Sequence, residues 1–322
     1  MDLGLRTVEA VYAQLHVDDE WCVDHERGFT WWGHDLAQSI WAETAFDDDG
    51  ITVWRVHART DLVTGLVDER GSLEVLSHLN ALGGLSAIGR DPADPTRLQL
   101  ATSLYVNEDN GEWVAPLFSL SAALQAADAH ALATELADLV RGERASSMHP
   151  TSGGRAEPDD MLAVVDDLPL RAGGSRFRGD EMQQAADFLL GTAASRATSD
   201  LGRLVAELPF GDGVCTLEAE TDEGHPRYGA GLRLTLKLPG GLPRVGAAQR
   251  VFQLNTLELT SFTRAHFVGS WCLSPDDPPH VTFHAYLPNL IYRPGILSNL
   301  LLSMALRARF VERDVLNRGA PV

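Results

Sequence analysis

The stretch Leu79-Asn80-Ala81-Leu82 returns in the second half of the chain as Leu254-Asn255-Thr256-Leu257. Four matched positions are weak support on their own, but similar elements follow both copies in the same order. Each stretch has helical spacing, and two alternating segments and a closing helix come after it. The sequence therefore predicts a divergent internal duplication. The alternative is that two α+β domains share this order without common descent.

The first half of the chain predicts a helix, three strands, a helix, two strands and a helix. Apolar residues recur at helical spacing in residues 3–16, 72–82 and 121–140, whereas apolar and polar residues alternate in the expected strands. Short hairpins join most of these strands, so we expect an antiparallel sheet with helices on one face. The expected strands are residues 29–32, 36–44, 51–60, 98–106 and 112–118.

The second half repeats this order less completely, with only two clear strands before its middle helix. Residues 143–179 have the Gly, Pro and Ser content of a linker, and an apolar island at 161–170 is expected to dock as an edge strand. A capping box at 180–183 opens helical periodicity that continues, with interruptions, to Leu208. Further on we expect strands at 214–220, 232–238, 265–273 and 280–287, a middle helix at 251–257 and a closing helix at 297–308.

These patterns divide the chain into two tandem α+β domains, residues 1–142 and 180–322, joined by the linker 143–179. Each domain is expected to hold an antiparallel sheet and helices in the order α-βββ-α-ββ-α. The chain length of 322 residues agrees with this division, because one hydrophobic core rarely serves so long a chain.

Composition excludes several classes of function. A formal charge of −19 argues against nucleic acid and anionic membrane surfaces as partners, since both are bound mainly through cationic side chains. It would permit attraction of a basic partner, although a solvated acidic surface is the simpler interpretation. Lys237 is the only lysine, which removes Schiff-base chemistry elsewhere and any phosphate-loop lysine.

The chain also carries few signs of export. Its N-terminus lacks the basic and then apolar order of a signal peptide, and its longest uncharged apolar run is too short to span a bilayer. Cys22, Cys215 and Cys272 are odd in number and widely spaced, which excludes a disulfide framework and a four-cysteine zinc site. We expect a cytoplasmic protein with reduced thiols.

No group of residues predicts a particular reaction. His280 and His284 have metal-ligand spacing only on a helix, and on the expected strand their imidazoles are roughly 13 Å apart. We therefore expect no catalytic residue, no metal and no cofactor. The alternative is a hydrolase or transferase whose site lies between the domains. Its first candidate residues are His34, Asp35, His57 and His284.

Several aromatic residues are candidates for contact with a partner. Trp54 shares a strand face with Val56 and is expected in the core, whereas Trp41 lies on the opposite face beside Ser39 and Glu43. An aromatic side chain on an open sheet face is typical of a peptide-binding surface, although the apolar island of the linker would also cover it. The candidate contact residues are Trp31, Trp41 and Tyr286.

The order of elements resembles the type III secretion chaperone-like fold, in particular the YbjN-type chaperone-like proteins of bacteria. The residues that carry the likeness are the strands at 29–32 and 51–60, the helix with Leu79-Asn80-Ala81-Leu82, and the hairpin of 98–106 with 112–118. The likeness covers residues 1–142 and, more weakly, 180–315.

This resemblance implies a non-enzymatic, acidic protein that binds partner polypeptides as a chaperone or adaptor. Members with one such unit pair into dimers. Two units in one chain would make that pairing internal, so the resemblance implies a monomeric pseudo-dimer, with a homodimer as the other possibility.

Overall fold

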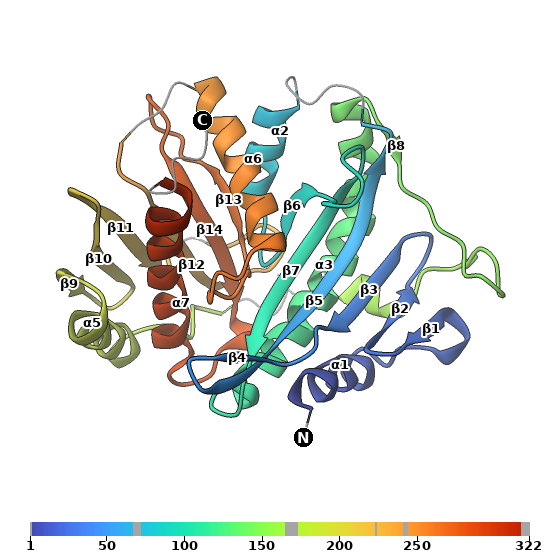
Figure 1. Ribbon diagram of the computed structural model, residues 1–322, viewed down its shortest axis with the longest axis horizontal. Helices are drawn as coiled ribbons and strands as arrows, with labels where there is room; N and C mark the ends of the chain where they lie inside the picture. Colours follow the sequence, from blue (N-terminus) through green and yellow to red (C-terminus); the bar gives the residue numbers. More distant parts are fainter. Residues whose placement is uncertain (1, 67–71, 165–172, 223, 241–243, 317–322) are drawn as a thin grey trace.

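The computed structural model describes residues 2–66, 72–164, 173–222, 224–240 and 244–316. Two antiparallel sheets lie side by side, and helices pack on both of them (Figure 1). The α+β class and the antiparallel sheets predicted from the sequence are confirmed.

The helices and strands of the described ranges follow one another along the whole chain. The helices are α1 (Leu3–Gln14), α2 (Leu73–Ala81), α3 (Gly111–Val140), α4 (Asp160–Val164), α5 (Asp180–Thr192), α6 (Arg244–Thr260) and α7 (Ile296–Phe310). The strands are β1 (Cys22–His25), β2 (Gly28–Trp32), β3 (Ala37–Ala42), β4 (Phe46–Asp48), β5 (Ile51–Thr64), β6 (Ala87–Arg90), β7 (Leu98–Val106), β8 (Glu143–Arg144), β9 (Arg196–Ser199), β10 (Arg203–Phe210), β11 (Gly213–Glu220), β12 (Gly231–Lys237), β13 (Ser270–Leu273) and β14 (Val281–Pro288).

The two sheets have the same strand order. The first runs β1-β2-β3-β5-β7-β6 and the second β9-β10-β11-β12-β14-β13, while β4 and β8 pair with β5 outside this order. Four main strands therefore precede the middle helix in each half, where three were expected in the first half and two in the second. The first half gains β1, a short polar edge strand whose residues show no clear alternation of apolar and polar side chains.

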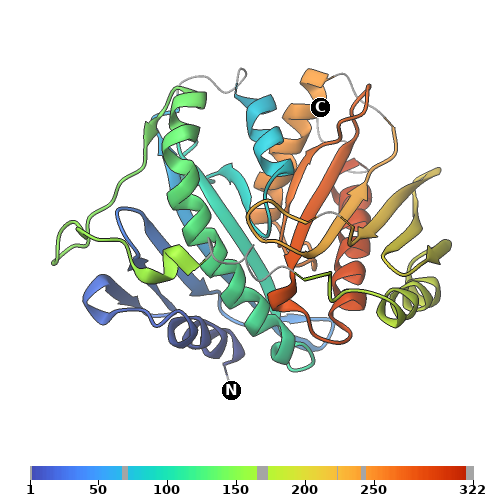
Figure 2. The same ribbon diagram turned by 180° about the vertical axis from the view of Figure 1, so that it is seen from behind.

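Each sheet has one face covered by two helices of its own half. α1 and α3 pack on the first sheet, and α5 and α7 pack on the second. α7 lies in front of its sheet in Figure 1, whereas α3 is the helix in front in Figure 2. Ile40, Val56 and Leu104 alternate along their strands with more polar residues and are fully buried in the core. The faces that these helices do not cover therefore point in opposite directions, and the middle helix of the other half covers part of each.

The repeated asparagines make the same contacts in both halves. Asn80 Nδ2 donates to the carbonyl oxygen of Ile88 at 3.1 Å, and its Oδ1 accepts from the Ile88 N–H at 2.8 Å. Asn255 makes the same pair of bonds with Trp271, at 3.0 and 2.8 Å. Both side chains are buried and tie the middle helix to the next strand, whereas Leu82 of the repeat is 55% exposed.

The two halves meet through their middle helices. α2 packs on α6 and on β13 of the second half, and α6 packs on β6 of the first half. Ser103 on β7 also forms a β-bridge with Phe267. A side chain at Gly84 would collide with Tyr228, because a Cβ atom there would lie 2.3 Å from its ring. This close approach lets the Tyr228 hydroxyl donate to Asp128 on α3.

Residues 112–118 form the first turns of α3, so the strand predicted there is wrong. The Oδ1 atom of Asn107 accepts two hydrogen bonds from N–H groups two and three residues further on, which turns the chain into the helix. Val114 and Leu117 are buried at helical spacing. The hairpin partner of β7 is instead β6, which precedes it in the chain.

The helical periodicity expected to reach Leu208 ends at Thr192, because residues 196–210 form β9 and β10. Leu204, Ala206 and Leu208 are buried at every second position, as in a half-buried strand. In the linker, Glu143–Arg144 add a short strand to β5. The part of the apolar island at 161–164 is helical rather than extended, and its remainder lies outside the described residues.

None of the helices in the described ranges combines the length and apolar content that a bilayer crossing requires.

Candidate functional site

Two grooves lie beside the closing helices α3 and α7. The α7 groove encloses about 550 Å³ and the α3 groove about 670 Å³. Apolar side chains form most of both linings, as is usual for binding sites. The α7 groove is lined by Leu208, Phe262, Leu306, Phe310, Arg264, Arg309, Arg313 and Glu312, with smaller residues between them. The α3 groove is lined by Leu15, Leu120, Leu124, Met161, Leu290, Ile291, Asp159 and Arg293, with others between them.

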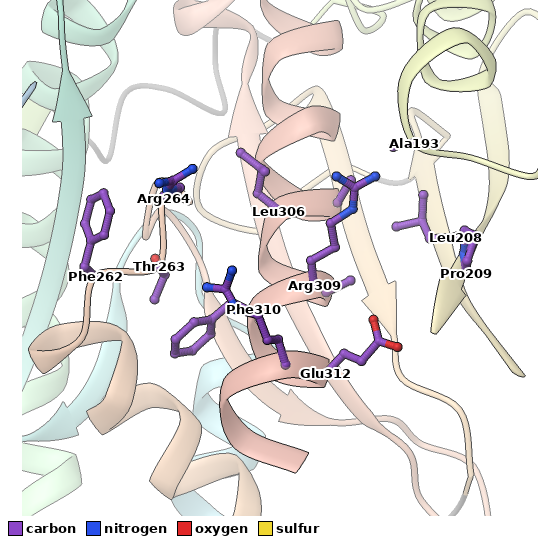
Figure 3. A pocket seen from close by; sticks show the side chains of 13 residues that line it. Ala193, Leu208, Pro209, Phe262, Thr263, Arg264, Leu306, Arg309, Phe310 and Glu312 are labelled. Carbon is purple, nitrogen blue, oxygen red and sulfur yellow. The ribbon is translucent and has the colours of Figure 1, made fainter. Parts of the chain in front are cut away.

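The α7 groove joins elements that are far apart in the sequence. In Figure 3, the loop with Phe262 and Arg264 lies on one side of α7, and Leu208 and Pro209 of β10 lie on the other. Leu306 and Arg309 stand on the helix between them. The site thus depends on the packing of α7 on its sheet and on the loop that leaves α6.

Contacts with the first half hold Phe262 at the edge of this groove. Its ring packs edge-to-face on Phe46 at 4.9 Å and on Tyr105 at 5.2 Å between ring centroids. Arg264 is bound by Asp48 and, at 3.0 Å, by Asp49. Phe262 nevertheless remains 43% exposed, so this anchored ring offers an apolar surface to a partner.

The rim of the α7 groove is cationic in a chain whose formal charge is −19. Arg264 and Arg313 are paired with carboxylates, the latter with Asp314 at 2.8 Å. Glu312 accepts a hydrogen bond from the Gly211 N–H at 2.6 Å. Within the described ranges Arg309 has no ion pair or hydrogen bond, and it is exposed. Its guanidinium is therefore available for an anionic group of a ligand.

The α3 groove differs in charge. Asp159 binds Arg155 at 2.9 Å and caps α4 by accepting from the Met161 N–H, while Asp160 is exposed at the rim. Arg293 also lines this groove and is exposed. Opposite charges therefore border this groove, and its apolar centre includes Leu290, which is 49% exposed.

Trp41 lies on the open face of the first sheet, as the alternation of β3 predicts, and is half-buried. Its ring stacks on His57 at 4.7 Å with an interplanar angle of 16°. The Arg59 guanidinium lies over the same ring at 4.9 Å from its centroid. A surface hollow of about 650 Å³ adjoins Trp41 and Glu43. The indole is thus covered in part by its own strand neighbours and not by the described part of the linker.

His57 beneath this stack is a neutral imidazole at pH 7. Burial lowers its pKa to about 4, against the opposing effect of Glu43, whose Oε1 lies 2.7 Å from His57 Nε2. The hydrogen bond from His57 in turn lowers the pKa of Glu43. The bond to Glu43 fixes the orientation of the His57 ring on which Trp41 stacks. His57 is only 1% exposed, so it cannot exchange a proton with a substrate.

Trp31 and Tyr286, the other candidate contact residues, lie inside the protein. Trp31 is 0% exposed because it shares the core face of β2 with Phe29. Tyr286 is also 0% exposed, and its hydroxyl donates to the Gly229 carbonyl oxygen at 2.5 Å. Neither side chain reaches the surface, so Trp41 alone of the three remains available to a partner.

The residues named for an enzyme between the domains fall into separate places. His34 and Asp35 lie together in the turn between β2 and β3, with 3.1 Å between Nδ1 and Oδ1. His57 belongs to the first sheet and His284 to the second. Among the described residues no hydrogen bond or ion pair joins His57 or His284 to the pair in the turn. The structure adds His130 to that pair, and sequence spacing gave no sign of it.

Comparison with protein-family models, with curated proteins and with solved structures finds no match to this chain.

Proposed function

We propose that the protein is a non-enzymatic polypeptide-binding chaperone or adaptor of the bacterial cytoplasm, and that its client docks in the α7 groove. The observation that supports this most is an apolar groove with an exposed aromatic ring, Phe262, and an exposed arginine without a partner among the described residues, Arg309. A groove of this kind suits an extended or helical segment that inserts apolar side chains.

We also propose that the two halves of the chain are tandem units of the type III secretion chaperone-like fold. The identical strand order of the two sheets and the matching bonds of Asn80 and Asn255 support two tandem chaperone-like units. The contacts of α2 with β13 and of α6 with β6 support a monomeric pseudo-dimer, in which the pairing surfaces lie within one chain. The cytoplasm suits three cysteines that are free thiols, two of them buried.

The chemistry of the α7 groove defines the client segment. Leu306, Phe310 and Phe262 offer apolar surface to aliphatic or aromatic side chains. Arg309 would pair with a carboxylate of the same segment, and the bidentate geometry of a guanidinium favours that group. The client is therefore a segment that combines apolar residues with aspartate or glutamate.

Photocrosslinking tests this proposal directly. Phe262 is replaced by p-benzoylphenylalanine, and the protein is incubated in source-cell lysate, irradiated and analysed by mass spectrometry. The control carries the same group at Leu201, which is 79% exposed and lies outside both grooves. We expect a few reproducible client peptides, rich in apolar and acidic residues, from position 262 only. Equal labelling from both positions, or none from position 262, would contradict the proposal.

Charge reversal supplies the matched comparison. Arg309→Glu should weaken binding of a peptide recovered from position 262 by about three- to tenfold, because an attractive pair becomes repulsive. Arg293→Glu introduces the same change at the α3 groove and should leave the affinity unchanged. Fluorescence anisotropy with the labelled peptide measures both variants.

A further inference from the structure

A cluster of His34, Asp35 and His130 lies where the β2–β3 turn meets α3. One ligand atom from each residue lies within 4.8 Å of the others. Nδ1 of His34 is 3.1 Å, and Nδ1 of His130 is 3.9 Å, from Oδ1 of Asp35. The three come from two elements, the β2–β3 turn and the middle of α3, so packing of α3 on the sheet assembles them.

One nitrogen of each imidazole in the cluster lacks a hydrogen-bond partner. Nδ1 of His34 and Nδ1 of His130 are buried and have no hydrogen-bond partner, although the side chains are 24% and 37% exposed. The 3.1 Å contact of His34 with Asp35 does not have the direction of a hydrogen bond. Buried polar atoms normally have partners, so two orphaned nitrogens that converge on one carboxylate oxygen indicate a missing ligand.

A small cavity with a largely apolar lining adjoins the cluster. It holds about 10 Å³, close to the space that one water needs, and is lined by His34, His130, Gln38 and Thr60 with apolar neighbours. Oε1 of Gln38 is buried without a hydrogen-bond partner as well. A water in this cavity would lie against both imidazoles and donate to Gln38.

We propose that His34, Asp35 and His130 bind one divalent transition-metal ion of the zinc type, with a water as its fourth ligand. Two imidazoles and a carboxylate are common zinc ligands, and ligand atoms around a tetrahedral ion are roughly 3.3 Å apart. The separations of 3.1 and 3.9 Å from Asp35 Oδ1 lie on either side of that value. Small rotations of the two partly exposed imidazoles would complete the geometry.

Arg144 on β8 orients the carboxylate of this site. Its guanidinium binds both oxygens of Asp35, Oδ1 at 2.9 Å. An ionised carboxylate has about four lone-pair positions, so Oδ1 can bind the ion while Oδ2 keeps its bond to Arg144. Such a hydrogen-bonded partner behind a metal ligand is usual. The ion would thereby connect the β2–β3 turn, α3 and the first residues of the linker.

Metal titration tests this site. Chelator-treated protein is titrated with Zn²⁺ by calorimetry and followed by thermal unfolding, and we expect one ion per chain and a raised unfolding temperature. His130→Ala should weaken binding by at least about tenfold. His78→Ala, at an exposed histidine of α2, is the matched control and should bind like the wild type. The idea is overturned if the wild type binds no ion, or if both variants bind equally well.

Cobalt provides a second measurement that does not depend on stability. Co²⁺ in a four-coordinate site gives visible absorption bands. In His130→Cys, a thiolate ligand adds a sulfur-to-cobalt charge-transfer band in the near ultraviolet. That band should appear only if position 130 is a ligand, so its absence in a folded His130→Cys protein contradicts the site.

Discussion

The closing helices α3 and α7 hold the same place on two sheets of the same strand order, yet different chemistry fixes them there. On α3, the buried amide of Gln125 accepts from Gln38 and Thr60 at 3.1 and 3.2 Å and donates to the Ala58 carbonyl oxygen at 3.1 Å. On α7, a buried charged group, the guanidinium of Arg307, binds instead to Glu258 of α6 and to the loop before β13.

Arg307 is enclosed by charged and aromatic partners. Its Nε donates to Glu258 Oε1 at 2.6 Å, its Nη2 donates to the His266 carbonyl oxygen at 2.7 Å, and its guanidinium lies 3.6 Å from the Phe283 ring centroid. Both charged side chains are 1% exposed. The closing helix of such a sheet can therefore be held by a buried neutral side chain, Gln125 on α3, or by a buried ion pair, Arg307 on α7 with Glu258 on α6. We call these the neutral anchor and the ionic anchor. α7 carries arginines on two sides: Arg307 is buried in the core, and Arg309 lines the α7 groove.

The largest expected effect comes from breaking the ionic anchor. Arg307→Met leaves the Glu258 carboxylate buried without a counter-charge, so the free energy of unfolding should fall by about 3–5 kcal/mol. Urea unfolding measures the change.

The double variant Glu258→Gln/Arg307→Met should recover part of the lost free energy of unfolding, since no uncompensated charge remains.

Gln125→Leu in the first half should lower the free energy of unfolding by less than Arg307→Met does, about 1–3 kcal/mol, because it leaves only neutral groups unpaired. Equal losses for Arg307→Met and Gln125→Leu would contradict the distinction between the two anchors.

The repeated asparagines should show where the halves are equivalent. Asn80→Ala and Asn255→Ala each leave one buried N–H and one buried C=O without a partner. Each should therefore lower the free energy of unfolding by about 2–4 kcal/mol. The two losses are expected to be similar, because both side chains are buried and make the same pair of bonds. A loss confined to one variant would mean that only one of the two bridges supports its half.

One histidine on each sheet, His57 on the first and His284 on the second, should make the free energy of unfolding depend on pH. Burial lowers the pKa of His57 on the first sheet and of His284 on the second to about 4. A histidine has a pKa of about 6.5 when unfolded, so the unfolded chain takes up the proton first and stability falls as pH drops from about 6.5 to 4.

His57→Gln removes this contribution on the first sheet. The difference in unfolding free energy between pH 7 and pH 5 should shrink by about 1–2 kcal/mol. His284→Gln should act in the same direction. An unchanged pH dependence in His57→Gln would show that its imidazole titrates normally.

The smallest expected effect on stability is that of Trp41→Ala. The indole is half-buried, stacks on His57 and contacts the Arg59 guanidinium, so the free energy of unfolding should fall by about 1 kcal/mol. Capture of the client should weaken if the bound segment continues from the α7 groove over the open face of the first sheet. Anisotropy with the same peptide as for Arg309→Glu compares the two surfaces. A collapse of the thermal transition would instead assign Trp41 to the core.

Much of the architecture followed from local patterns in the chain. Alternation along β3, β5, β7 and β12 and helical spacing in α1, α2 and α7 predicted an antiparallel α+β protein, because burial of one face acts on each element separately. The repeat around Asn80 and Asn255 also pointed to the two bridges that tie helix to strand in both halves.

Other features depended on tertiary contacts. Residues 112–118 are apolar enough for a strand, and only packing on the sheet and the turn at Asn107 make them helical. Trp31 was predicted to contact a partner at the surface, but its side of β2 faces the core and its side chain is fully buried. The groove of Phe262 and Arg309, and the meeting of His34 with His130, join residues about 50 and 100 positions apart. Local patterns along a chain determine which face of an element is buried, but only the folded structure determines which distant side chains share a site.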